Sequence, residues 1–142
     1  MTTGAISRAG RDDWGKLVLR VTVAGLLLLH GIFKVKNGVA WIGGPLSAVG
    51  LPAFLAYGVY VGEVIAPIFV IVGKFTRIAA LIMAFDLLMA ILLVQRERIF
   101  MINPQGGGLG VELETFFCLG SVAIALLGSG RYALSKGQGR WD

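Results

Sequence analysis

Long apolar runs separated by short polar or glycine-rich segments dominate the chain. A bilayer core of about 30 Å requires about 20 predominantly apolar residues in one helix, and four stretches approach this length: 17–35, 52–72, 75–94 and 110–127. Turn signals between the first two stretches predict an outer loop with a brief helix. Because only helices and closed barrels satisfy their own backbone groups in lipid, we expect an all-α integral membrane four-helix bundle with up-down topology.

The composition agrees with a membrane protein. Hydrophobic residues make up 56% of the chain, charged residues 15%, and the mean hydropathy is +0.81, whereas ordinary soluble domains are roughly 45–50% apolar. The net charge of +5 is scattered at the edges of apolar runs, so nucleic-acid binding is not expected. The single cysteine, Cys118, excludes an intrachain disulfide and a cysteine-based metal cage. We expect no metal site and no cofactor resident in the chain.

The distribution of basic residues predicts the orientation, because an excess of Lys and Arg marks the cytoplasmic side. The predicted spans divide the basic residues nine against four: Arg8, Arg11, Lys16, Arg20, Lys74, Arg77, Arg131, Lys136 and Arg140 against Lys34, Lys36, Arg96 and Arg98. Both termini are therefore expected in the cytoplasm. No long hydrophilic region remains for a second domain, so residues 1–142 are expected to form one membrane domain.

Ionisable side chains within or beside the apolar stretches are the candidate functional residues. Each costs about 2.5–3.5 kcal/mol near the bilayer centre, and the candidates are His30, Lys34, Glu63, Asp86, Glu112 and Glu114. Burying four of them separately would cost about 10 kcal/mol on the same scale. We therefore expect these side chains to converge on one polar pocket that opens outward, where Lys34 balances the carboxylates.

Structural explanations for the same residues stay open at this level. Glu63 can bond to backbone groups near Pro67, and Asp86 can be a structural partner of Lys34. The two acids that open the fourth stretch favour the positive end of a helix dipole. A lone histidine such as His30 is more often a satisfied polar residue than a ligand.

The second stretch contains small residues suited to close helix packing. Gly58 and Gly62 lie four residues apart, a spacing that lets two helix backbones approach. Pro67 follows one turn after Glu63 and weakens the helical hydrogen-bond ladder. We expect a homo-oligomer that forms through Gly58 and Gly62.

Several motifs together resemble a known family. The first stretch ends with "HGIFK", the second contains Glu63, the tight turn reads "GKFTR", and "GSGRY" follows the fourth stretch. In order and spacing, residues 17–134 resemble the bacterial DoxX family of small membrane proteins. The resemblance implies a four-helix protein of the inner (cytoplasmic) membrane, often labelled an oxidoreductase, with quinones as a candidate ligand class.

In that reading the chain is a quinone-interacting subunit or accessory of a membrane redox complex. Glu63 and Asp86 would exchange protons with the quinone oxygens, and His30 would donate a hydrogen bond to the ring system. The expected substrate-binding residues are Lys34, Trp41, Tyr57, Tyr60, Glu112 and Glu114. Because the chain has no visible redox centre, electrons would come from a partner subunit, and whether the chain is an enzyme stays open.

Two other functions fit the same sequence. A small-molecule, ion or proton transporter would use the acids to bind its cargo midway across the membrane. A non-catalytic assembly or scaffold protein would use the polar cluster only to hold its helices together. A transporter needs polar residues that continue to the inner side, where the bundle offers little besides Thr22, Thr76 and Arg20.

Overall fold

A computed structural model describes residues 3–142, and this part of the chain is all-helical. The α-helices are α1 (Thr3–Asn37), α2 (Gly43–Ala48), α3 (Gly58–Tyr60), α4 (Ala66–Val72), α5 (Thr76–Met89) and α6 (Glu112–Leu127). Shorter 3₁₀ and π segments are η1 (Ala40–Ile42), η2 (Ala53–Tyr57), η3 (Val61–Ile65), η4 (Ala90–Val94) and η5 (Arg96–Arg98). The only extended pairing in residues 3–142 is one isolated antiparallel bridge between Ile102 and Leu109.

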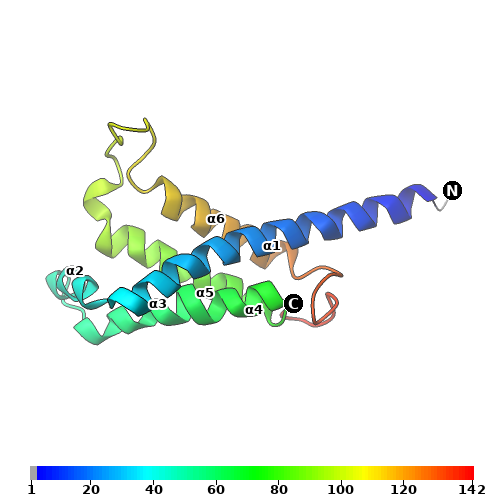
Figure 1. The fold of residues 1–142 in the computed structure, drawn as a ribbon, viewed down its shortest axis with the longest axis horizontal. Coiled ribbons are helices and arrows are strands. Elements are labelled where there is room, and N and C mark those ends of the chain that lie inside the picture. The colour runs from blue at the N-terminus through cyan, green and yellow to red at the C-terminus, as the bar shows by residue number, and fades with distance from the viewer. Residues whose placement is uncertain (1–2) are drawn as a thin grey trace.

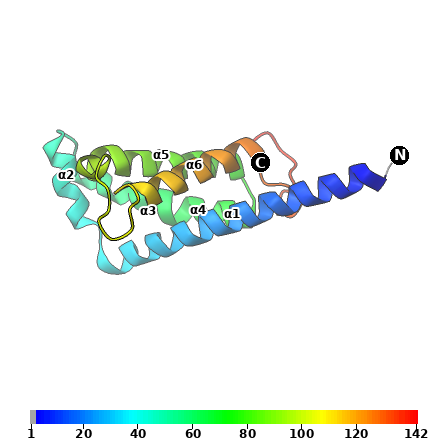
Figure 2. The same cartoon turned by 90° about the horizontal axis from the view of Figure 1, so that it is seen from above.

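The long helices lie side by side, as Figures 1 and 2 show. Helix α1 packs against α4 and α6, while α5 packs between α4 and α6. The N-terminal part of α1 projects beyond the other helices, and α2 lies at the opposite end of the molecule (Figure 1). The expected helix in the loop after the first stretch is therefore present as η1 and α2.

The second stretch forms a continuous helical run from Ala53 to Val72 whose winding changes three times. Its π-helical segment η3 contains Glu63 and ends directly before α4, whose first turn contains Pro67. Proline has no N–H to donate to the carbonyl four residues earlier, which here belongs to Glu63. The wider winding of η3 agrees with the ladder weakening expected from Pro67, and π-turns are frequent at functional sites.

A very short turn joins α4 to α5, as the sequence predicts. Gly73 and Phe75 both adopt left-handed backbone conformations, with φ of 77° and 53°. Glycine takes this conformation without steric cost, whereas phenylalanine does not. The chain reverses direction here within three residues, between Val72 and Thr76.

The core is formed by apolar side chains of four helices. Its buried members are Val23, Ala24 and Leu27 of α1, Ala66 and Val70 of α4, Ala79, Ala80, Met83 and Leu87 of α5, and Phe117, Ile124 and Ala125 of α6. Several of them are alanines, which let the helix axes approach closely. Many large apolar side chains point outward instead, as expected for helices that face lipid.

In the described part of the chain, three helical segments are long and apolar enough to cross a membrane: Gly10–Asn37, Ala53–Val72 and Thr76–Val94. Three of the four predicted spans are thus confirmed as membrane-capable, although the first helix extends well beyond the expected range of 17–35. The fourth stretch forms α6, which has 16 residues and is shorter than these segments.

The side chain of Arg77, in the first turn of α5, bonds both to the end of α6 and to the segment that follows it. Its guanidinium donates hydrogen bonds to the carbonyls of Ala125 and Leu126 at 2.8 and 2.9 Å, and to that of Asp142 at 2.9 Å. The contacts with Ala125 and Leu126 satisfy carbonyl groups that the end of α6 leaves unpaired. We call this part of the molecule the basic end; it comprises Arg20, Arg77, the α4–α5 turn and residues 128–142.

Candidate functional site

An ion pair between α1 and η3 lies at the centre of the candidate site. The Nζ of Lys34 donates to Oε1 of Glu63 at 2.5 Å, and the Glu63 side chain is almost fully buried. The two helices approach so closely here because residue 31 is glycine: a Cβ at Gly31 would overlap the carbonyl of Glu63. The "HGIFK" motif therefore provides both the close contact and the cation.

Asp86 of α5 lies beside this pair. A Cβ at Gly62 would overlap the Asp86 carboxyl group, so glycine at this position allows the carboxyl to approach η3. Asp86 lies within electrostatic reach of both Glu63 and Lys34. One oxygen of each acid, Oε2 of Glu63 and Oδ2 of Asp86, is buried without a hydrogen-bond partner in residues 3–142. Two carboxyl groups and one lysine thus lie close together, and one oxygen of each carboxyl group is free to accept a hydrogen bond from a ligand.

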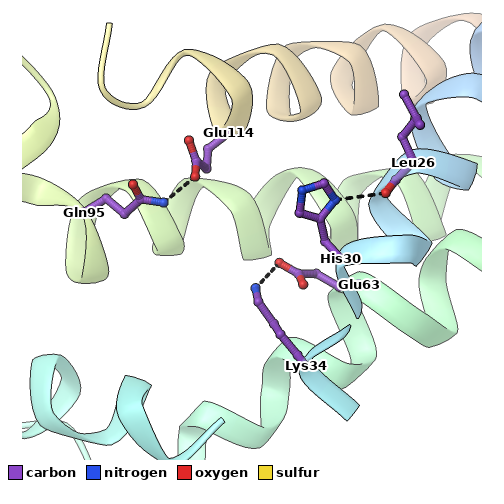
Figure 3. Close-up of polar contacts among 6 residues, drawn as sticks. All are labelled: Leu26, His30, Lys34, Glu63, Gln95 and Glu114. Carbon is purple, nitrogen blue, oxygen red and sulfur yellow. Dashed lines mark hydrogen bonds and ion pairs between the residues drawn. The ribbon is translucent and has the colours of Figure 1, made fainter. Parts of the chain in front are cut away.

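His30 lies next to the ion pair, one turn before Lys34 on α1 (Figure 3). Its Nδ1 lies 3.0 Å from the carbonyl of Leu26, and its ring packs edge-on against Phe117 at 5.6 Å. A carbonyl oxygen can only accept, so Nδ1 carries the proton in this contact. The Nε2 of a neutral His30 is then an acceptor, and the expected donation to a ligand requires the imidazolium form.

A cavity of about 650 Å³ opens beside these residues. Its polar lining comes from His30, Lys34, Glu63, Asp86, Gln95 and Glu114. The rest of the wall is mostly apolar and includes Leu27, Ile42, Leu46, Ala56, Leu87, Leu93 and Phe117. The size is typical of small-molecule sites, which are mainly apolar with a few placed polar groups. The candidate charges therefore occupy a few positions in a wall that is otherwise mostly apolar.

A second polar contact lies across the cavity from the ion pair. The Nε2 of Gln95, after η4, donates to Oε1 of Glu114 on α6, and its Oε1 accepts from Nη1 of Arg98 at 3.0 Å. Figure 3 shows this contact and the Lys34–Glu63 pair as two separate clusters. Glu114 lies in the first turn of α6, where the sequence allowed a plain helix-dipole role, and it also lines the cavity.

The remaining predicted residues are divided by the structure. Trp41 lines the cavity. Tyr57 is exposed, and its ring lies tilted against that of Tyr60, with centroids 6.1 Å apart. The Tyr60 hydroxyl donates to the Lys34 carbonyl at 3.3 Å. Neither tyrosine lines the cavity, nor does the exposed Glu112, so the structure does not bring these three to the site.

Sequence reasoning missed Gln95 and did not identify which apolar residues form the wall. Gln95 comes directly after an apolar stretch, where a polar side chain suggests only the end of a helix. Phe117 is indistinguishable in sequence from its neighbour Phe116, yet only Phe117 is buried. No group of three His, Cys, Asp or Glu side chains suited to a metal ion occurs in the described part of the chain.

The fold and site define a class: an all-helical protein with several membrane-capable helices around a largely apolar cavity. The DoxX family profile matches residues 15–96, and the chain belongs to the DoxX family. It is 32% identical over 123 residues to the "Putative oxidoreductase CatD" of Bacillus subtilis (strain 168), covering 84% of each chain. It is also 31% identical over 121 residues to an uncharacterized protein of Haemophilus influenzae, covering 83% of this chain and 86% of that protein. No solved structure matches the chain.

Proposed function

We propose that this protein is a quinone-interacting subunit or accessory of a membrane redox complex. The observation that supports this function best is the cavity of about 650 Å³, whose apolar wall carries the Lys34–Glu63 pair and Asp86 on one side. A quinone has a flat apolar ring and two carbonyl oxygens that take up protons on reduction. The relative named as an oxidoreductase points to the same reaction class.

The proposed arrangement in the membrane is a four-helix up-down bundle in the inner (cytoplasmic) membrane, with both termini in the cytoplasm. Helix α6 would provide the fourth crossing, because it is apolar and packs along α5 between the other long helices. At about 1.5 Å per residue its 16 residues span about 24 Å, close to the thickness of a thin bilayer. The cavity would then open toward the outer side.

The chemistry proposed for the site is proton exchange with a bound quinone. Reduction to the quinol consumes two electrons and two protons, and the electrons would come from a partner subunit. Lys34 balances one carboxylate, so of Glu63 and Asp86 the other can give up or take up one proton at a ring oxygen, and the second proton would be exchanged with His30 at the other ring oxygen. His30 would bond to a ring oxygen as an imidazolium, or accept from a quinol hydroxyl when neutral.

The geometry offers less support for the transport alternative. The polar side chains of the cavity lie at one end of the bundle, and the buried core of Val23, Val70, Met83 and Ile124 lies between them and Arg20. A path for ions would need polar groups through this layer. If the protein is instead a scaffold, variants of the cavity change its assembly with other proteins, and neither the unmodified protein nor the variants bind quinone.

The test is recovery of bound quinone from the full-length protein purified in mild detergent, by extraction and mass spectrometry. Asp86→Asn and Ala90→Phe both alter the cavity wall, the first by removing a proton-exchanging group and the second by filling space. We expect Ala90→Phe to abolish recovery, and Asp86→Asn to retain quinone while lowering quinol turnover in membranes about 100-fold, the scale of one acid–base group.

Matched controls come from the same elements. Leu92→Phe adds the same ring to η4 at an exposed position that does not line the cavity, and Glu112→Gln removes an exposed carboxylate outside the cavity. Both should behave like the unmodified protein. The proposed function would be overturned if the unmodified protein contained no quinone and membranes with the Asp86→Asn variant showed unchanged quinol turnover.

A further inference from the structure

Arg20 carries an unpaired buried charge. It lies on α1 with 1% of its surface exposed, and its Nη2 donates to the carbonyl of Tyr132 at 2.5 Å. Its Nε and Nη1 have no hydrogen-bond partner in the described part of the chain. A guanidinium has five N–H donors and stays protonated in proteins, so most of its donor capacity is unused.

No described carboxylate forms an ion pair with this charge. Among residues 10–142, whose side chains the structure describes, the Lys34–Glu63 pair is the only ion pair. Asp13, an acid that packs near this end, accepts from the backbone N–H of Arg131 at 3.0 Å instead. A buried charge without a counterion is strongly unfavourable, so an anion at this position would stabilise the folded protein.

A pocket of about 510 Å³ lies at this position, on the basic end. Three of its lining residues are cations and none is an acid: Arg20, Arg131 and Lys136. The others are Leu17, Ile71, Val72, Tyr132, Ala133 and Leu134, which are mostly apolar. The pocket therefore combines a cationic floor and rim with walls suited to hydrocarbon.

Tertiary contacts build this pocket. The backbone N–H groups of Leu134 and Ser135 donate to the carbonyls of Val72 and Gly73 at 3.1 Å each, so the chain after α6 closes over the end of α4. Gly73 has φ of 77°, and any Cβ there would overlap Nη1 of Arg20. Glycine at this turn thus leaves room for the guanidinium as well as permitting the left-handed backbone.

We propose that this pocket binds a phosphate group, with Arg20 as the buried donor and Arg131 and Lys136 at its rim. The planar guanidinium fork matches two phosphate oxygens and forms charge-assisted hydrogen bonds with them. The phosphate can belong to the headgroup of an anionic phospholipid or to a free phosphate. Anionic lipids concentrate on the cytoplasmic side, where basic pockets between helices hold their headgroups, and the basic end is expected on that side.

The experiment measures binding to the delipidated full-length protein in detergent, by native mass spectrometry and by the shift of the thermal unfolding midpoint. The probes are phosphatidylglycerol, diacylglycerol with the same acyl chains but no phosphate, and inorganic phosphate. We expect phosphatidylglycerol to bind and diacylglycerol to have no comparable effect. The double variant Arg131→Gln/Lys136→Gln, at exposed positions, should weaken binding at least about tenfold, equivalent to about 1.4 kcal/mol.

Lys74→Gln is the matched control, because Lys74 is exposed at the same end but does not line the pocket. It should leave the affinity within about twofold, which is less than 0.5 kcal/mol. Arg20→Gln should abolish binding. If this variant does not fold, the double variant Arg131→Gln/Lys136→Gln at the rim still tests the proposal. If inorganic phosphate binds and the same variants lose this binding, the site is supported with free phosphate as its ligand. Equal binding of phosphatidylglycerol and diacylglycerol, absence of any phosphate binding, or an unaffected rim variant overturns the proposal.

Discussion

The two ends of the helix bundle handle buried charge in opposite ways. Beside the cavity, charges from separate helices meet directly, and Lys34 on α1 pairs with Glu63 on η3. At the basic end, arginines meet backbone carbonyls instead: Arg77 bonds three of them, and Arg20 bonds one. A carbonyl offers partial charge without neutralising a cation. The first end therefore contains an ion pair with a second carboxyl group beside it, whereas the buried arginine of the second end has no ion-pair partner among the described side chains. That difference predicts which changes are most damaging.

The largest effect is expected from breaking the balanced pair. Lys34→Met leaves Glu63 buried and uncompensated, which should lower the free energy of unfolding by about 3–5 kcal/mol. Adding Glu63→Met should recover most of this loss, because replacing both partners with apolar groups is often neutral. Detergent-solubilised protein unfolded by denaturant gives both values, and simple additivity of the two single variants would show that the pair is not coupled.

A smaller loss is expected at the basic end from Arg77→Gln. Hydrogen bonds to a charged group are worth about 1.5–3 kcal/mol, and the carbonyls of Ala125, Leu126 and Asp142 would lose their common donor. We expect stability to fall by about 2–3 kcal/mol and amide exchange to accelerate in residues 131–142. Arg140→Gln is the control, because Arg140 is exposed and lies over the Trp141 ring; a similar loss there would argue against a specific role for Arg77.

The closeness of α1 and η3 can be tested with glycine variants. Gly31→Ala forces a methyl group against the Glu63 carbonyl and should cost about 1–3 kcal/mol, as overpacking does. Gly25→Ala on the same helix meets nothing within 4 Å, so it should be neutral or stabilising by up to about 1 kcal/mol. Thermal unfolding compares the two, and equal effects would contradict the close approach.

The smallest effect is expected across the cavity. Gln95→Met removes the donor to Glu114, and a single partly exposed hydrogen bond contributes about 1 kcal/mol. Denaturant unfolding measures the loss. Gln105→Met is the control, because it makes the same substitution at an exposed position in a loop. A fall in the free energy of unfolding above about 3 kcal/mol would mean that Gln95 and Glu114 are coupled to the buried Lys34–Glu63 pair.

The sequence predicted the helical class well because apolar runs of about 20 residues have few alternatives in lipid. The expected meeting of Lys34, Glu63 and Asp86 also followed from energetic reasoning, since isolated buried charges are costly. Dimerisation through Gly58 and Gly62 stays a prediction. Gly62 already faces Asp86 within the chain, whereas a Cβ at Gly58 would meet nothing within 4 Å, so only Gly58 is open to another molecule.

The sequence did not show which of the candidate side chains would line the cavity. Tyr57 and Tyr60 were expected to border a quinone ring, and Glu112 was a candidate because it is an acid that opens the fourth stretch, but none of the three lines the cavity. The direction of a side chain depends on the phase of its helix. In the second stretch that phase changes as the winding passes from 3₁₀ through α to π. Pro67 indicates where the helical ladder weakens, but residue type and spacing do not reveal the resulting change of phase.

By itself, the sequence determined that this protein is helical, apolar and charged at a few buried points, because composition and run length fix what lipid tolerates. The tertiary structure decided which partner the buried charge at the basic end has. Arg20 reads in sequence as one more basic residue at the end of a span, yet the chain after α6, more than 100 residues later, covers it and supplies its carbonyl partner. Long-range contacts of this kind depend on how the helices pack, which local pattern does not encode.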